Sequence, residues 1–140
     1  MTKRQKEVLC QAVEEHLNIL VVGGTSSGKT TFANAIIAEM VRQFPDERHI
    51  TIEDTLEIQC TAENVVPMHT TLEVTTTKCL KQTLRLRPTR IHVGEVRDEA
   101  ALALLDAWNT GHQGGLSTLH ANSAEELSLI HISEPTRRSY

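Results

Sequence analysis

One stretch strongly limits how this chain can fold: G-G-T-S-S-G-K-T, at residues 23–30. It satisfies the pattern G-x-x-x-x-G-K-[ST] at every fixed position. The apolar run before it, residues 19–22, predicts a buried parallel strand. Residues 30–41 predict a helix, because apolar side chains recur there at helical spacing. A strand, this loop and a helix in succession indicate a phosphate-binding loop rather than a surface turn. The apolar positions of that helix are Phe32, Ala35, Ile36 and Met40.

The composition of this loop suits phosphate chemistry. Glycines let backbone N–H groups curl around phosphate oxygens, and the following helix N-terminus adds partial positive charge. The Lys29 ammonium can contact the β- and γ-phosphates of a nucleotide, and the Thr30 hydroxyl can bind Mg²⁺. The residues that we assign to phosphate and cofactor binding are Gly23, Gly24, Thr25, Ser26, Ser27, Gly28, Lys29, Thr30 and Thr31.

Composition argues against several other kinds of protein. The 140 residues are 39% apolar, which suits one globular domain with a real core. A formal charge of −4 and only 3% aromatic residues argue against direct, sequence-specific nucleic-acid binding. Cys10, Cys60 and Cys79 are far apart and odd in number, which predicts free thiols in a reducing cytosol. The sequence contains no apolar run that could span a membrane and no signal peptide.

An acidic cluster follows the second predicted strand, residues 49–52. It contains Glu53, Asp54 and Glu57. Carboxylates at the C-terminal edge of a parallel sheet face the ligand crevice, where they can hold magnesium through water or polarise an attacking water. A solvated turn is the alternative interpretation, and spacing alone does not separate the two.

Another predicted strand, residues 91–97, also ends in an acid. Such a strand some distance after a phosphate loop is typical of the second half of an ATPase site, and here the acid is Glu95. Gly94 before it allows close backbone approach. His92 lies mid-strand, so we expect a packed histidine rather than a ligand.

Two histidines flank the last predicted strand, residues 116–119. His112 precedes it in a glycine-rich turn, and His120 follows it, with Asn122 and Ser123 close behind. A turn histidine and a core histidine would be the ordinary interpretation. Beside a phosphate loop, sensing of the γ-phosphate is the functional alternative. Neither histidine has the further ligands at metal spacing that a zinc site needs.

The remaining segments complete an alternation of helices and strands. Residues 2–16 predict a helix capped by Thr2, and residues 65–68 a strand at the sheet edge because of Pro67. Asp98 is the expected cap of a helix that ends near Thr110. A further helix is expected over residues 77–86, and its end is crowded by Arg85, Arg87 and Arg90. These arginines either stabilise the helix by placing positive charge at the negative end of its dipole, or one of them contacts a phosphate, here or in a neighbouring subunit.

Four stretches together resemble the traffic ATPases of bacterial type II and type IV secretion. They are G-G-T-S-S-G-K-T-T, T-I-E-D-T-L-E-I, L-R-L-R-P-T-R-I-H-V-G-E-V-R and A-W-N-T-G-H-Q-G-G-L-S-T-L-H-A-N-S. In that family they are the phosphate loop, the Asp box, the Walker B strand and the His box. The resemblance covers residues 2–126 and is strongest to the TrbB-type ATPases of conjugative type IV secretion. It implies an α/β fold: a RecA-like P-loop NTPase core with a mostly parallel sheet and flanking helices.

The resemblance also implies a function and a set of site residues. It implies ATP and Mg²⁺ as ligands, a hexameric ring at the cytoplasmic face of the inner membrane, inner-membrane channel proteins as partners, and powered transfer of protein or nucleoprotein. The catalytic residues that it implies are Glu53 and Glu57 of the Asp box, Glu95 of Walker B, and His112 and His120 of the His box. Thr30 and Glu95 would hold magnesium, partly through water. Either Glu57 or Glu95 could activate the attacking water.

Two other functions remain open on the sequence. One is a type II secretion or pilus-assembly ATPase, although the Cys-x-x-Cys module that such proteins often carry is absent here. The other is a nucleotide-binding module that assembles into rings without turnover. The module without turnover would apply to this chain if it is truncated, because both an upstream domain and the region after the His box are expected to be missing.

The two ends of the chain are therefore expected to differ in origin. Residues 1–126 are expected to be a partial RecA-like ATPase domain whose sheet stops at residues 116–119, leaving that strand edge uncovered. Residues 127–140 are expected to be non-native, because residues 127–137 are what a transposon-end sequencing adapter encodes. An amphipathic native helix is the alternative for this tail.

Deleting residues 127–140 should therefore leave the melting temperature unchanged within a degree or two, because nothing selected this tail to pack on the domain. Thermal unfolding followed by circular dichroism measures the effect. A drop of about ten degrees, roughly 2 kcal/mol for a domain of this size, would show that the tail belongs to the fold.

Overall fold

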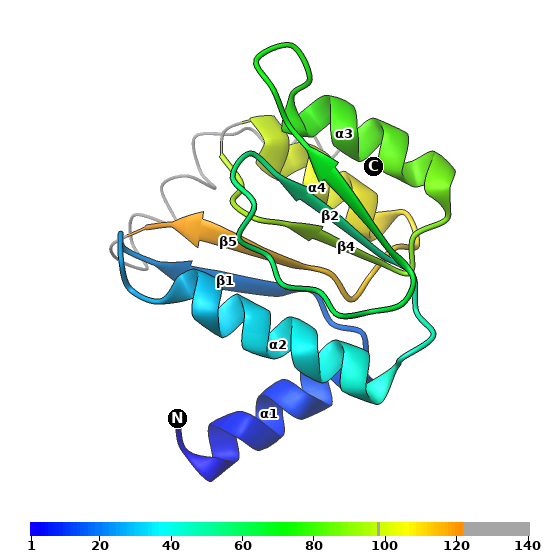
Figure 1. Ribbon diagram of the computed structural model, residues 1–140. Coiled ribbons are helices and arrows are strands. Elements are labelled where there is room, and N and C mark those ends of the chain that lie inside the picture. The colour runs from blue at the N-terminus through cyan, green and yellow to red at the C-terminus, as the bar shows by residue number, and fades with distance from the viewer. Residues whose placement is uncertain (98, 122–140) are drawn as a thin grey trace, which may run out of the picture.

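The computed structural model describes residues 1–97 and 99–121. Helices and strands alternate along most of this length (Figure 1). The helices are α1 (Lys3–Glu14), α2 (Lys29–Gln43), α3 (Thr76–Thr83), which continues as a 3-10 turn η1 (Leu84–Leu86), and α4 (Glu99–Asn109). The strands are β1 (Ile19–Gly23), β2 (His49–Glu53), β3 (Val65–His69), β4 (Arg90–Val93) and β5 (Leu116–His120).

The strands form one five-stranded sheet in the order β1-β5-β4-β2-β3, and every pair is parallel. Helices α1 and α2 pack on one face, around a cluster that includes Val13, Ile37 and Leu116. Helices α3 and α4 cover the other face, around Leu80 and Trp108. Parallel strands need crossover helices on both faces, and this sheet has them. The predicted α/β architecture is confirmed.

Local sequence signals explain most element boundaries. Thr2 begins α1 in a reciprocal capping box with Gln5, as its hydroxyl predicted. Gly111 follows α4 in a left-handed conformation with φ of 97°. Strand β3 lies at the edge of the sheet, where Pro67 removes no ladder hydrogen bond from a central strand. Asp98, the expected cap of α4, lies outside the described residues.

One expectation about the sheet is wrong. Strand β5 does not leave the sheet edge open, because it lies between β1 and β4; β1 is the edge strand on that side of the described sheet. Chain order does not equal strand order when every connection is a crossover. Of the four apolar positions at helical spacing in α2, Ile36 and Met40 are buried, whereas Phe32 and Ala35 are exposed.

A buried histidine pair lies between the central strands. His49 on β2 and His92 on β4 are both fully buried, and Nδ1 of His49 shares a hydrogen bond of 2.9 Å with Nε2 of His92. The expectation that His92 is a packed strand histidine is confirmed. Burial lowers the pKa of both rings, and the nearby Arg90 guanidinium lowers both further. Both imidazoles are therefore neutral in the folded protein at neutral pH.

This pair should make the fold sensitive to acid. The unfolded chain takes up protons on these histidines below about pH 6.5, whereas the folded chain resists them, so stability is lost as the pH falls through that value. We expect the free energy of unfolding to fall by about 2 kcal/mol between about pH 7.5 and pH 5. Urea unfolding at several pH values measures it.

The exposed His69 on β3 offers a matched control. Replacing it with glutamine should leave the pH dependence unchanged. A free energy of unfolding that stays level down to pH 5 would contradict the neutral-pair interpretation.

Candidate functional site

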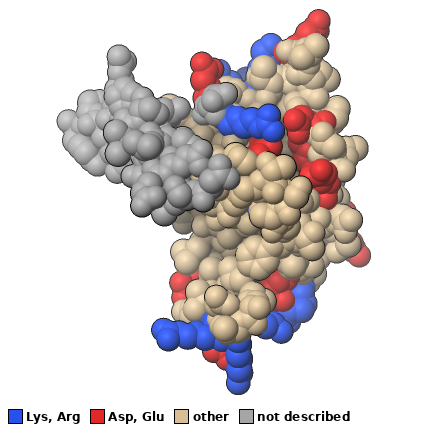
Figure 2. All heavy atoms as spheres, turned by 90° about the vertical axis from the view of Figure 1, so that its left-hand side faces the viewer, with Lys and Arg blue, Asp and Glu red and all other residues tan. Residues whose placement is uncertain are grey.

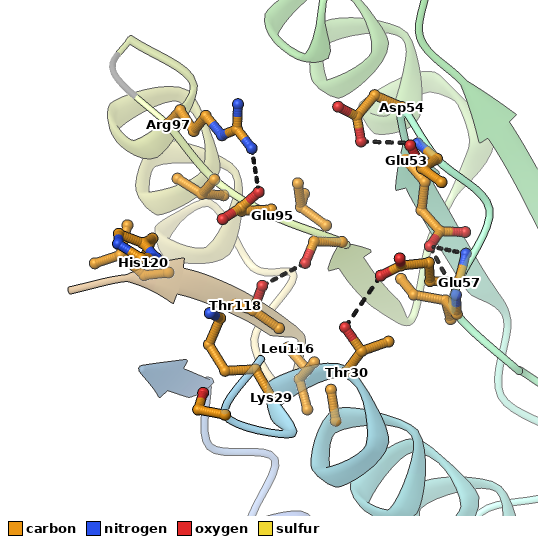
Figure 3. Close-up of a pocket in the computed structure, with 18 of the residues that line it drawn as sticks. Lys29, Thr30, Glu53, Asp54, Glu57, Glu95, Arg97, Leu116, Thr118 and His120 are labelled. Carbon is orange, nitrogen blue, oxygen red and sulfur yellow. Dashed lines mark hydrogen bonds and ion pairs between the residues drawn. The ribbon is translucent and has the colours of Figure 1, made fainter. Parts of the chain in front are cut away.

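A cleft of about 1140 Å³ opens at the C-terminal edge of the sheet. Its lining includes the loop residues 25–31, the acidic ends of β2 and β4, and the end of β5 (Figure 3). Figure 2 looks at the molecule from the side toward which β1 and β5 point, and shows charged side chains around a broad uncharged area. The cleft is therefore where a doubly wound sheet binds its ligands.

The predicted phosphate-binding loop joins β1 to α2 and lies against the cleft. Gly28 takes φ of 84°, a conformation that favours glycine, and a Cβ atom on Gly23 would lie 2.6 Å from the Ser27 hydroxyl, which would then have to move. The Lys29 ammonium donates hydrogen bonds to the carbonyl oxygens of Gly23 (2.9 Å) and Gly24 (2.8 Å). The lysine thus lies across the loop, where phosphate oxygens would be stronger acceptors than these carbonyls.

Helix α2 begins at Lys29, directly after the loop, so its positive end faces the cleft. Thr25, Ser26 and Thr31 also line the cleft. The structure therefore gathers residues 25–31 around one space, whereas Gly23 and Gly24 are not among the residues that line it.

The two acids of the Asp box have different positions. Glu53, at the end of β2, is buried, and its Oε1 atom accepts hydrogen bonds from the backbone N–H groups of Glu57 (2.9 Å) and Ile58 (2.7 Å). Glu57 instead contacts the helix that follows the phosphate loop: its Oε2 atom accepts a hydrogen bond of 3.1 Å from the Thr30 hydroxyl. Glu53 therefore shapes the segment, and Glu57 is the acid that it presents to the phosphate loop.

Thr30 and Glu57 together fit the ligand geometry of magnesium. Two neighbouring ligands of octahedral Mg²⁺, each about 2.1 Å from the ion, are about 3.0 Å apart. Oγ1 of Thr30 and Oε2 of Glu57 are 3.1 Å apart. The described residues contain no group of three or more His, Cys, Asp or Glu that could hold a metal alone. Such a pair suits Mg²⁺, which usually keeps water and phosphate ligands.

Glu95 follows β4 and points into the same cleft, paired with Arg97 in an ion bridge. A Cβ atom on Gly94 would lie 3.1 Å from Cγ of Glu53, so glycine there lets the two acidic strand ends approach. Thr118 on β5 donates a 2.6 Å hydrogen bond to the Gly94 carbonyl. No sequence signal pointed to Thr118, because its role depends on which strand lies beside β4.

The two histidines of the His box lie at opposite ends of strand β5. His120 ends β5 beside Gly23 of β1 and lines the cleft. His112 precedes β5, and its Nδ1 atom is 3.2 Å from the Pro88 carbonyl at the start of β4. The structure therefore does not bring His112 into this cleft, because the length of β5 separates the two rings. Asn122 and Ser123 lie outside the described residues.

Arg90 also lies away from the cleft, so of the alternatives for the three arginines, contact with a phosphate of this cleft does not hold for Arg90. It is fully buried, forms an ion pair with Glu47, and donates a 2.7 Å hydrogen bond to the carbonyl of Gly114. Its guanidinium lies 5.2 Å from the centre of the Phe44 ring. Arg90 thus anchors the glycine turn of the His box. Arg85 and Arg87 are exposed and are not among the residues that line the cleft.

This fold and this loop define a RecA-like protein of the P-loop class. The profile of the family described as "Type II/IV secretion system protein" matches residues 1–130, so the chain belongs to that family. The chain is 57% identical over 124 residues to the conjugal transfer protein TrbB of Rhizobium radiobacter, covering 89% of this chain and 38% of that protein. The predicted resemblance to TrbB-type proteins is confirmed.

Solved structures show the same fold. The VirB11 ATPase of the Brucella suis type IV secretion system, in complex with sulphate, superposes with a TM-score of 0.83 at 33% identity, covering 91% of this chain and 37% of that one. The pilus retraction motor PilT with bound ADP gives a TM-score of 0.72 at 30% identity, covering 99% of this chain and 40% of that one. The chain therefore spans less than half the length of the relatives that it matches.

Proposed function

We propose that this protein binds ATP with Mg²⁺ and, in its full-length form, hydrolyses it to power conjugative transfer through a type IV secretion system. The observation that carries the proposal is the contact between Thr30 and Glu57 across the mouth of the phosphate loop, with Glu95 on the same cleft. The TrbB and VirB11 relatives support the choice of conjugation and type IV secretion.

The polar residues named above have distinct roles in this proposal. Backbone N–H groups of the loop and the Lys29 ammonium bind the β- and γ-phosphates. Magnesium, held by Thr30 and Glu57, would neutralise charge on those phosphates. Glu95 orients the attacking water and takes its proton, and His120 is placed to contact the terminal phosphate. Glu53 keeps the Asp box folded through its two backbone contacts.

The assembly proposed for the full-length protein is a hexameric ring at the cytoplasmic face of the inner membrane, in contact with channel proteins there. No helix among the described residues is long and apolar enough to cross a membrane. His112, Arg85 and Arg87 lie outside the cleft of their own subunit, so any contact that they make with nucleotide would be to the site of a neighbouring subunit.

A pilus or type II assembly motor is the second candidate, and the likeness to PilT favours it. A third candidate is a ring-assembly module without turnover, which would suit a chain covering about 38% of its relatives. Size exclusion with and without ATP, combined with a phosphate-release assay, separates turnover from assembly alone. ATP-dependent assembly without phosphate release would favour the third candidate.

Replacing Lys29 with alanine should remove most ATP affinity. The ammonium makes charge-assisted contacts to two phosphates, and the loss of such a contact costs on the order of 2–3 kcal/mol, or about 30-fold to 150-fold in the dissociation constant. Equilibrium binding of a fluorescent ATP analogue measures the change.

Lys78 is the matched control, because its ammonium also donates to a backbone carbonyl, that of Glu73, but lies outside the cleft. Its alanine variant should bind ATP as the unmodified chain does. Affinity that changes by less than about twofold in the Lys29 variant would reject the phosphate-loop assignment.

In the full-length protein, Glu95→Gln should retain ATP binding and lose hydrolysis. Glutamine keeps the shape and hydrogen bonding of glutamate but cannot accept the proton of the attacking water. Single-turnover hydrolysis measures the chemical step, with Glu57→Gln in parallel. If Glu57→Gln is inactive while Glu95→Gln turns over normally, the general base is in the Asp box instead.

A further inference from the structure

Asn34 lies one helical turn after Thr30 on α2, at a position to which the sequence analysis assigned no role. Residues four apart on a helix lie on the same face, so both side chains face the Asp-box segment 54–59. Asn34 is half-buried there. Its amide thus meets the segment that carries Glu57.

Both ends of the Asn34 amide are hydrogen-bonded to the backbone of that segment. Nδ2 donates to the Glu57 carbonyl at 3.0 Å, and Oδ1 accepts from the Gln59 N–H at 2.9 Å. The C=O of one residue and the N–H of the second residue after it are the two groups that a neighbouring strand would bind. The side chain of Asn34 therefore replaces a strand partner for a segment that has none.

Glu53 supplies the remaining contacts. Its carboxylate accepts the N–H groups of Glu57 and Ile58, while Asn34 takes the Glu57 carbonyl and the Gln59 N–H. Residues 56–60 belong to no helix or strand. Two side chains, one from β2 and one from α2, thus fix the backbone on both sides of the Glu57 side chain.

We propose that Asn34 is a positioning residue that holds the Asp-box segment against α2, so that the Glu57 carboxylate stays beside the Thr30 hydroxyl. This deepens the proposed function and rests on it, because that proposal places magnesium at the Thr30–Glu57 pair. Thr30 and Asn34 lie one turn apart on α2, and both contact Glu57. The start of α2, where phosphates are proposed to bind, and the acid of the Asp box are therefore tied to the same helix.

The test compares Asn34→Ala with Gln43→Ala in the 140-residue chain. Gln43 is on the same helix and its amide also makes two hydrogen bonds, to the Cys10 carbonyl and to Glu39, but it ties α2 to α1 and not to the Asp box. For each variant, the dissociation constant of a fluorescent ATP analogue is measured with Mg²⁺ and with EDTA. The ratio of the two constants reports the magnesium contribution alone.

We expect Asn34→Ala to reduce that ratio by about fivefold to tenfold, the effect of losing hydrogen bonds of ordinary strength. Binding in EDTA should change little, and Gln43→Ala should keep the ratio of the unmodified chain. Asn34→Asp keeps an acceptor for Gln59 but loses the donor to Glu57, so its ratio should be intermediate. A general loss of stability would weaken binding equally with and without Mg²⁺.

Hydrogen exchange at the Gln59 amide gives a second readout that needs no ligand. Exchange at this amide should accelerate in Asn34→Ala, and it should be slower in Asn34→Asp than in Asn34→Ala. A magnesium ratio within about twofold of the unmodified chain in Asn34→Ala overturns the proposal. If the unmodified chain binds no nucleotide, the proposed function is rejected, and hydrogen exchange alone then tests the positioning role. Unchanged protection of the Gln59 amide in Asn34→Ala would reject the positioning role. Accelerated exchange would support it.

Discussion

The parallel register of the central strands is the constraint on which the site depends. Gly23 of β1 pairs with His120 of β5, and Ile52 of β2 pairs with Val93 of β4. Parallel strands all end at the same edge, so segments that are distant in sequence meet there. The phosphate loop, both acidic strand ends and His120 therefore line one cleft.

Side chains, rather than further secondary structure, hold the irregular segments at that edge. Glu53 and Asn34 bind the Asp-box backbone, and Thr118 binds the Gly94 carbonyl. These contacts give hydrogen-bond partners to backbone groups that no helix or strand pairs. The segment that presents Glu57 is thus held by side-chain hydrogen bonds, although it carries no regular structure.

At the other end of the strands, the buried guanidinium of Arg90 makes several contacts. Arg90 is fully enclosed and is paired with Glu47, whose other oxygen contacts His16. Breaking a buried pair of this kind typically costs about 3–5 kcal/mol. Through the Gly114 carbonyl, the same arginine contacts the turn between α4 and β5.

Sequence alone was enough to predict the alternation of elements, the phosphate-binding loop and the family. Those features depend on local signals: glycine spacing, apolar periodicity, and the acids directly after buried strands. The burial of His92 and the edge position of β3 also followed from position within a strand and from Pro67. Each of these can be read from a few neighbouring residues.

Only the tertiary structure decided which residues face the cleft. It separated His112 from His120, enclosed Arg90, and placed β5 inside the sheet rather than at its edge. It also showed that Asn34 and Thr118 hold the acidic segments. These outcomes depend on strand order and on contacts between segments far apart in the chain, and crossover connections of similar sequence are compatible with more than one order. Local pattern determines what each segment becomes, and long-range packing determines what it touches.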